Sequence, residues 1–148
     1  MKKKIVYVDM DGVLCDFVAA HAEALAANPG ILYPQSQYGF FRNLRPMPGA
    51  IAAMASLRSN PELDVYILTA PSIPNPLCYS EKREWAETYL GMDMVRRLII
   101  SPNKGLSKGD FLIDDHIEGR GQDRFEGRLI HFGSDEYPGW EEVLRVFA

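Results

Sequence analysis

Residues 4–13 read KIVYVDMDGV, a short apolar stretch followed by two aspartates one residue apart and then a glycine. The continuous run of apolar and β-branched residues predicts a strand that is buried on both faces, as in a parallel sheet. Asp9 and Asp11 then lie at the carboxyl end of that strand, where ligands bind in open α/β sheets. A carboxylate at this place can attack phosphorus and form an aspartyl-phosphate. Taken alone, the motif is equally consistent with a simple turn, because Asp and Gly favour turns.

The composition is typical of a globular protein. The chain has 148 residues, of which 47% are hydrophobic and 24% charged, and its net charge is −4. This length favours a single domain, residues 1–148, with one sizeable core. The charge balance argues against a nucleic-acid or anionic-membrane partner, since such surfaces gather Lys and Arg. A small anionic substrate remains compatible, because a bound metal ion can invert the local field.

The sequence shows no sign of export or membrane insertion. The apolar run from Ile5 to Val8 is shorter than the roughly 7–15 apolar residues of a secretory signal. No stretch approaches the roughly 20 residues that span a bilayer. Cys15 and Cys78 have no metal-binding spacing, and free thiols are typical of the cytoplasm. We therefore expect a cytoplasmic protein, and the sequence leaves open whether it forms a homodimer.

Strand-like and helix-like stretches alternate along the chain. Strands are expected at residues 3–8, 63–68, 98–101, 111–113 and 127–132. Helices are expected at residues 17–27, 50–58, 80–90 and 140–147. The prolines and glycines within residues 31–48 indicate irregular structure there. Such an alternation predicts an α/β protein with a parallel sheet and right-handed crossovers.

The ends of the expected strands carry compatible chemistry. Thr69 follows the second strand, Lys104 follows the third, and Asp114 and Asp115 follow the fourth. Because the carboxyl ends of parallel strands share one edge, these groups can converge with the two aspartates of the first strand. Carboxylates are ligands for Mg²⁺, a hydroxyl can donate to a phosphoryl oxygen, and a lysine offers a point charge to an anion. The set is typical of phosphoryl transfer.

Each of these residues also has an ordinary structural explanation. Thr69 by itself is a common strand-end hydroxyl that caps a turn. Lys104 by itself is a solvated surface lysine, and the pair Asp114-Asp115 can cap a helix. Four strand ends with compatible chemistry, in this order, favour a functional site over four independent coincidences.

The same residues resemble the haloacid dehalogenase (HAD) superfamily and, within it, the 5′(3′)-deoxyribonucleotidases. The similar segments are DMDGVLCDF at residues 9–17, RPMPGA at 45–50, YILTAP at 66–71, SEK at 80–82 and FLIDD at 111–115. The resemblance covers most of the chain. It implies a three-layer, Rossmann-like α/β fold with a parallel sheet. It also implies that residues 16–48 form a small cap inserted after the first strand.

The resemblance implies how the catalytic and metal-binding residues act. Asp9 would be the nucleophile, and Asp11 would be the acid/base that protonates the leaving sugar oxygen and then activates water. A Mg²⁺ ion would be held by the Asp9 carboxylate, the Asp11 backbone carbonyl and the Asp115 carboxylate. The residues alone do not decide whether Asp114 or Asp115 contacts the ion, because adjacent strand residues point to opposite faces.

The resemblance also implies a substrate-binding set. Thr69 and Lys104 would bind the phosphoryl group, with Lys82 as a second cation nearby. Phe17 and Phe41 would face the base of a nucleotide, and aromatic faces do stack on nucleobases. The alternative for these two rings is a place in the hydrophobic core.

We therefore expect a Mg²⁺-dependent phosphomonoesterase that hydrolyses (deoxy)nucleoside monophosphates through an aspartyl-phosphate, with a small-molecule phosphomonoester as its partner. One alternative is a phosphatase of the same superfamily that acts on a sugar phosphate or an acid phosphate. The other is a non-catalytic protein that binds a phosphorylated metabolite. The intact pair of Asp9 and Asp11 favours an enzyme over the binding protein.

Overall fold

The computed structural model describes residues 2–148 and contains one five-stranded parallel sheet with the strand order β3-β2-β1-β4-β5. The first strand, which is apolar on both faces, therefore occupies the centre of the sheet, with β2 and β4 on either side. The strands are β1 (Lys4–Val8), β2 (Leu63–Thr69), β3 (Leu98–Ile100), β4 (Phe111–Asp114) and β5 (Arg128–His131). The parallel α/β fold expected from the sequence is confirmed.

The helices follow the expected segments closely. The α-helices are α1 (Phe17–Ala27), α2 (Ala50–Ser59), α3 (Cys78–Leu90), α4 (Met92–Val95) and α5 (Trp140–Arg145). Short 3-10 helices lie at η1 (Pro34–Ser36), η2 (Lys104–Leu106) and η3 (Gln122–Arg124). Helix α3 begins at Cys78 rather than at the expected Ser80. The reason is Asn75, whose side-chain oxygen accepts the Leu77 N–H at 3.0 Å and whose carbonyl accepts the Cys78 N–H, so this turn starts the helix earlier.

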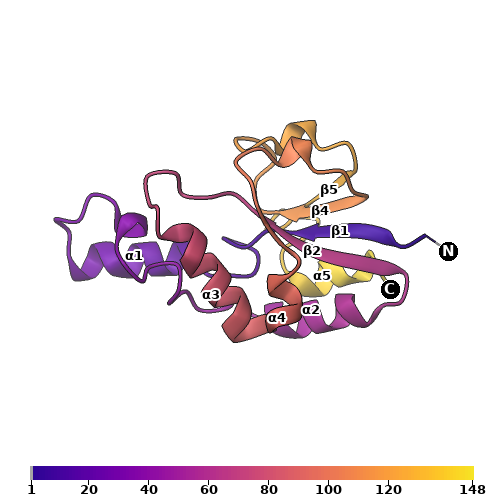
Figure 1. Cartoon of the computed structure of the whole chain (residues 1–148), viewed down its shortest axis with the longest axis horizontal. Coiled ribbons are helices and arrows are strands. Elements are labelled where there is room, and N and C mark those ends of the chain that lie inside the picture. Colours follow the sequence, from indigo (N-terminus) through magenta and orange to yellow (C-terminus); the bar gives the residue numbers. More distant parts are fainter. Residues whose placement is uncertain (1) are drawn as a thin grey trace.

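The two faces of the sheet are covered differently. One face packs Val6, Val8 and their counterparts on the neighbouring strands against residues of α2, α3 and α5 in the main core. On the other face Tyr7 packs edge-on against Phe125, in a smaller cluster beneath the segment that carries η2 and η3. Figure 1 shows α2, α4 and α5 below the strands and the orange segment with the 3-10 helices above them. The layer on this second face is therefore built from turns and 3-10 helices rather than from long α-helices.

The segment of residues 16–48, which we call the cap segment, leaves the sheet after β1 and returns beside its own starting point. Cys15 forms an antiparallel bridge with Pro46. On either side of this bridge the Asp16 N–H donates to the Arg45 carbonyl and the Met47 N–H donates to the Leu14 carbonyl, both at 2.8 Å. Helix α1, which is capped by the Asp16 side chain, projects beyond the carboxyl ends of the strands in Figure 1. The cap segment therefore stands at the edge of the sheet where the sequence places the functional residues.

Candidate active site

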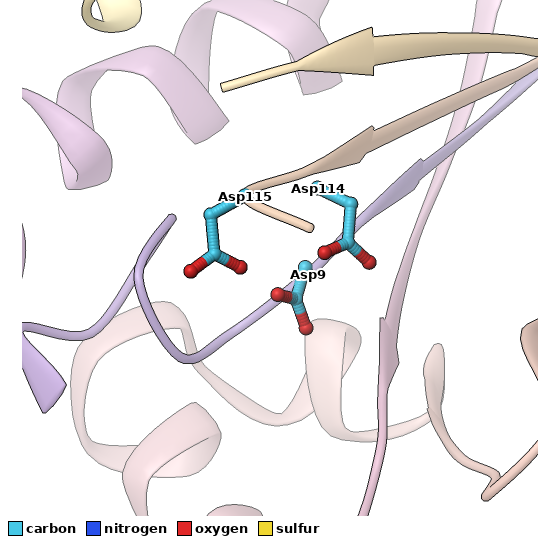
Figure 2. Close-up of side chains that lie close together, drawn as sticks. All are labelled: Asp9, Asp114 and Asp115. Atoms are coloured by element: carbon cyan, nitrogen blue, oxygen red, sulfur yellow. The ribbon is translucent and has the colours of Figure 1, made fainter. Parts of the chain in front are cut away.

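Three carboxylates converge at the carboxyl edge of the sheet. Asp9 follows β1, Asp114 ends β4 and Asp115 comes next, and their carboxylate oxygens lie within 4.8 Å of one another. Figure 2 shows these side chains close together at the ends of two adjacent strands. The register of the sheet explains their approach, because Val8 lies opposite Ile113. Two acidic segments more than 100 residues apart thus form one cluster.

Two buried lysines reach this edge, one from each face of the sheet. The Lys104 ammonium comes from the side of η2 and lies 2.8 Å from Asp9 Oδ1 and 2.5 Å from Asp114 Oδ2. The Lys82 ammonium comes from α3, on the helical side, and lies 3.0 Å from Asp11 Oδ2. The two aspartates of the β1 motif therefore contact different lysines.

Thr69 and Lys82 lie behind Asp11. Thr69 is fully buried at the end of β2, and its hydroxyl lies 2.6 Å from the Lys82 ammonium. Lys82 also donates to the Ala70 carbonyl at 2.9 Å. The fully buried ammonium of Lys82 thus has three oxygen partners, from Thr69, Ala70 and Asp11. Lys82 therefore contacts Asp11 directly, and Thr69 reaches Asp11 only through the Lys82 ammonium.

Burial and mutual repulsion dominate the electrostatics of the carboxylate cluster. Burial raises the pKa of Asp9 well above its ordinary value, Lys104 opposes the shift, and the charges of Asp114 and Asp115 reinforce it. Burial also raises the pKa of Asp115 to about 6, with hydrogen bonding to Asp9 acting in the opposite direction. For Lys104, burial works to lower the pKa, but Asp9 and Asp114 together outweigh it and raise that pKa. Lys104 is therefore a permanent cation beside a cluster that holds more negative charge than one lysine can balance.

The donor set fits a hard divalent cation. Asp115 Oδ1 is buried and has no hydrogen-bond partner among residues 2–148. Asp114 is different, because its Oδ2 contacts Lys104 and its Oδ1 accepts the His116 N–H at 2.9 Å. An unpartnered buried carboxylate oxygen is costly unless a cation or donor meets it, and carboxylate oxygens are the ligands of Mg²⁺. The hydrogen bonds of Asp114 leave Asp115 as the better ligand.

Gly12 is the backbone feature that permits this arrangement. Its φ of +84° lies in the left-handed region, and a Cβ built there would lie 2.1 Å from Asp115 Oδ2. Only a residue without a side chain lets the β1 turn pass so close to this carboxylate.

We expect Gly12→Ala to displace Asp115 and lower kcat/KM by about 100-fold or more, the scale seen when a catalytic group moves by about 1 Å. Gly133→Ala is the matched control, because Gly133 has a similar φ of +88° but no atom lies within 4 Å of the place that its Cβ would take. Steady-state kinetics of the two variants, with melting temperatures to show that both fold, would check this. Equal losses in the two variants would contradict the role of Gly12.

A cavity of about 560 Å³ opens over the carboxylates. Its floor includes Asp9, Asp11 and Lys104, and Phe17 and Phe41 form part of its wall on the cap side. The loops after β2 and β4 form most of the remaining wall. The volume falls within the roughly 300–1,000 Å³ of small-molecule sites. Asp115 also lines the cavity, whereas Thr69 and Lys82 are buried outside its lining and reach it through Asp11.

Sequence reasoning missed one residue that supports the site. Gln122 is buried and spans from Asp114 to the loop that borders the cavity. Its Nε2 lies 3.5 Å from Asp114 Oδ2, and its Oε1 accepts the Arg120 N–H at 2.7 Å. A lone glutamine in a segment rich in glycine and charge carries no local signal, so only the tertiary structure identifies it.

Solved structures of HAD-type hydrolases share the parallel α/β fold of this chain. A HAD-hydrolase of Bacillus subtilis bound to magnesium superimposes with a TM-score of 0.69 and 12% identity, covering 99% of both chains. A haloacid dehalogenase-like hydrolase of Burkholderia xenovorans gives a TM-score of 0.53 and 14% identity, covering 87% of this chain and 80% of the other. At such identities the likeness concerns the fold.

Sequence comparison then gives the family. The family model described as "5' nucleotidase, deoxy (Pyrimidine), cytosolic type C protein" matches residues 31–147. A Vibrio phage KVP40 protein assigned as a 5′(3′)-deoxyribonucleotidase is 41% identical, over 96% of this chain and 83% of its own. The human cytosolic-type 5′(3′)-deoxyribonucleotidase is 32% identical, over 94% of this chain and 78% of its own. The chain belongs to this family of phosphoric monoester hydrolases, and the resemblance seen in its motifs is confirmed.

Among residues 2–148, no helix combines the length and the apolar character needed to cross a bilayer.

Proposed function

We propose that this protein hydrolyses (deoxy)nucleoside monophosphates with the help of Mg²⁺ and through a phosphorylated Asp9. The observation that carries the proposal is the pairing of Asp9 with Lys104 at 2.8 Å and of Asp11 with Lys82 at 3.0 Å on the floor of one cavity. Two carboxylates with separate environments can take two separate chemical roles. The family membership and the acidic cluster support the same assignment.

In the first step, an Asp9 carboxylate oxygen attacks the phosphorus atom of the substrate. The bond between phosphorus and the sugar oxygen breaks, and the carboxylic acid of Asp11 donates its proton to that oxygen, so that a nucleoside leaves. Lys104, which contacts Asp9 Oδ1, fixes the nucleophile and balances part of the charge at the phosphoryl group. Preorganised charge of this kind is commonly the largest contribution to such a reaction.

In the second step, the Asp11 carboxylate takes a proton from a water molecule, whose oxygen attacks the phosphorus of the aspartyl-phosphate. The bond between phosphorus and the Asp9 oxygen breaks, inorganic phosphate leaves, and Asp11 is again protonated. Lys82 holds Asp11 in place during both steps, and the Thr69 hydroxyl fixes the Lys82 ammonium. General acid–base catalysis by a positioned carboxyl group contributes about 10²–10⁴-fold.

A Mg²⁺ ion would be held by Asp9, Asp115 and the backbone carbonyl of Asp11. When bound, the ion supplies positive charge to the phosphoryl oxygens and keeps the cluster ionised. The residues support this role, because burial raises the pKa of Asp9 well above its ordinary value and a nearby cation would favour the ionised form. Lys104 opposes that shift only in part.

The aromatic wall of the cavity favours a nucleotide over a sugar phosphate. The Phe17 and Phe41 ring centroids lie 6.1 Å apart, and both residues line the cavity. Stacking of a base on an aromatic ring is worth about 1–3 kcal/mol. Phe17 is half-buried on the first turn of α1 and lines the cavity, so part of its side chain is accessible to a ligand there.

We expect Phe17→Ala to raise KM for a nucleoside monophosphate about tenfold, at 1.4 kcal/mol per decade, with little change for 2-deoxyribose 5-phosphate. Phe125→Ala is the control, because Phe125 is equally aromatic but packs against Tyr7 on the other face of the sheet. That variant should lose stability without a selective change in KM. An equal loss for both substrates in Phe17→Ala would place the ring in the core rather than in the base site.

A panel of phosphomonoesters, assayed with and without Mg²⁺, tests the proposal as a whole. The panel contains deoxynucleoside and ribonucleoside monophosphates in their 5′ and 3′ forms, 2-deoxyribose 5-phosphate and acid phosphates. A higher kcat/KM for nucleotides than for the base-free sugar phosphate is the expected result. A preference for sugar or acid phosphates would contradict the proposed nucleotide substrate, but it would be compatible with phosphomonoester hydrolysis.

A further inference from the structure

Glu81 is a buried carboxylate that the proposed chemistry does not use. It lies in the first turn of α3 with 3% of its surface exposed. Its two oxygens accept main-chain N–H groups of the cap segment. Oε2 accepts from Gly39 at 2.8 Å, and Oε1 accepts from Phe41 at 3.1 Å and from Arg42 at 3.4 Å. A single side chain of the core domain thus holds three backbone groups of the cap segment.

These hydrogen bonds matter because the stretch they hold has little regular structure of its own. Residues 37–43 form turns rather than a helix or a strand. Gly39 has a φ of +83°, so this stretch changes direction at a left-handed glycine. A buried carboxylate is tolerated only when donors surround it, and charge-assisted bonds are roughly twice as strong as neutral ones. Glu81 is therefore the principal anchor of this stretch among the described residues.

The neighbouring residue connects the same helical turn to the catalytic groups. Lys82 follows Glu81 and holds Asp11 through its ammonium. The Phe41 ring covers this ammonium, with the Lys82 Nζ 5.2 Å from the ring centroid. The first turn of α3 thus fixes the backbone of Phe41 with one residue and supports its ring and the acid/base carboxylate with the next.

Through Phe41, Glu81 also sets the aromatic wall of the cavity. The Phe40 and Phe41 ring centroids lie 5.2 Å apart, and Phe40 lies 5.4 Å from Phe17, in both cases edge to face. A displaced Phe41 backbone would therefore move the surface on which a base can stack. The phosphoryl site would be spared, because Asp9 and Lys104 are held from the other face of the sheet.

We propose that Glu81 is a positioning residue for substrate discrimination, which holds the Phe41 wall so that the enzyme favours nucleoside monophosphates over base-free phosphates. The proposal rests on the proposed function, and it adds the residue that sets the preference. Glu81 touches neither the substrate nor the reacting atoms, and it acts through Gly39, Phe41 and Arg42.

The test compares a 5′-deoxynucleoside monophosphate with 2-deoxyribose 5-phosphate as substrates of Glu81→Gln. Gln has the same size but replaces one acceptor oxygen with an NH₂ group that faces main-chain N–H donors. We expect KM for the nucleotide to rise about tenfold, kcat to stay within about threefold, and kcat/KM for the sugar phosphate to stay within about threefold. Glu84→Gln is the control, because it makes the same change one turn further along α3, at a half-exposed residue that pairs with Arg42. This variant should leave KM and kcat/KM for both substrates unchanged.

A second variant perturbs residues 37–43 at Gly39, whose N–H donates to Glu81. Gly39→Ala strains the left-handed glycine and places a Cβ 3.0 Å from Asn43 Nδ2, while Glu81 and α3 keep their sequence. It should show the same selective loss for the nucleotide. In a Phe41→Leu background, Glu81→Gln should cause no further selective loss, because the residue through which it acts is gone.

The outcomes separate this proposal from the proposed function. A wild-type enzyme without a preference for the nucleotide would contradict the substrate class. A wild-type preference that survives in both Glu81→Gln and Gly39→Ala would overturn the role of Glu81. Equal losses for the two substrates, in proportion to a lowered melting temperature, would also overturn it by making Glu81 a purely structural anchor.

Discussion

Replacing Asp9 by Asn is expected to abolish turnover, with a loss on the order of 10⁴-fold or more, as when the nucleophile of a hydrolase is removed. The amide cannot attack phosphorus, while its shape preserves the close fit between β1 and β4. Asp9 lines the floor of the cavity and accepts a hydrogen bond from Lys104 at 2.8 Å, which would orient its carboxylate for the attack. Single-turnover and steady-state kinetics with a nucleoside monophosphate would measure the loss.

Trapping of the intermediate makes this test specific. Hydroxylamine should convert the aspartyl-phosphate of the wild type into a hydroxamate at Asp9, which mass spectrometry of peptides can locate. The Asp9→Asn variant should give no such product. Asp135→Asn, the same change at an exposed position, should behave as the wild type. Normal turnover in the Asp9 variant, or a hydroxamate at another residue, would rule out the covalent mechanism.

Chelation of divalent cations is expected to lower activity by about 10³-fold or more. Charge stabilisation by a bound cation is worth several kcal/mol, and each 1.36 kcal/mol is a factor of about ten. Asp115→Asn should raise the Mg²⁺ concentration needed for half-maximal activity. Lys104→Ala should not raise it, because Lys104 donates hydrogen bonds and offers no ligand. Equal activity with and without EDTA would exclude the metal requirement.

Without a metal ion, the stability of the folded protein should depend on whether the carboxylate cluster is protonated. The pKa of Asp115 is about 6 in the folded state against an ordinary value of 3.8, so the folded state holds this proton more tightly than the unfolded state. The resulting stabilisation is complete below about pH 4 and is lost as the pH rises through about 6.

We therefore expect the melting temperature without Mg²⁺ to fall between about pH 5 and pH 7.5, and the raised pKa of Asp9 contributes in the same direction. Added Mg²⁺ should restore most of the loss at the upper end of this range and little at the lower end, where protons compete for the carboxylates. Asp115→Asn, which cannot ionise, should flatten the pH dependence without metal. A melting temperature that is independent of both pH and Mg²⁺ would contradict a metal site in this cluster.

Several features of the fold follow from local sequence. The apolar run before Asp9 predicted the central strand, and the helix expected at residues 17–27 has those bounds in the structure. Asp16 before it and Asn28 after it are local signals, which a single sequence displays without reference to the rest of the chain. The alternation of strands and helices then required a parallel sheet, because short right-handed crossovers leave few other arrangements.

The sequence also predicted that the side chains at the carboxyl ends of the strands lie close together. It did not predict which of these side chains contact one another. Asp114 and Asp115 are chemically identical neighbours. Only the register of β4 against β1 turns Asp114 toward Lys104 and leaves Asp115 beside Gly12. Thr69 and Lys82 carried the right chemistry at the right place in the chain, yet packing of α3 against the sheet decides that they meet behind Asp11.

The sequence by itself determined the parallel sheet, the strand that carries Asp9 and Asp11, and the chemical character of the edge where the strands end. These depend on apolar periodicity and turn residues, which act over a few neighbouring positions. Only the tertiary structure decided which lysine meets which aspartate, and that Glu81 holds the backbone of the cap segment from 40 residues away. Such contacts are formed by the packing of helices and loops onto the sheet, and residue type and spacing along the chain do not encode them locally.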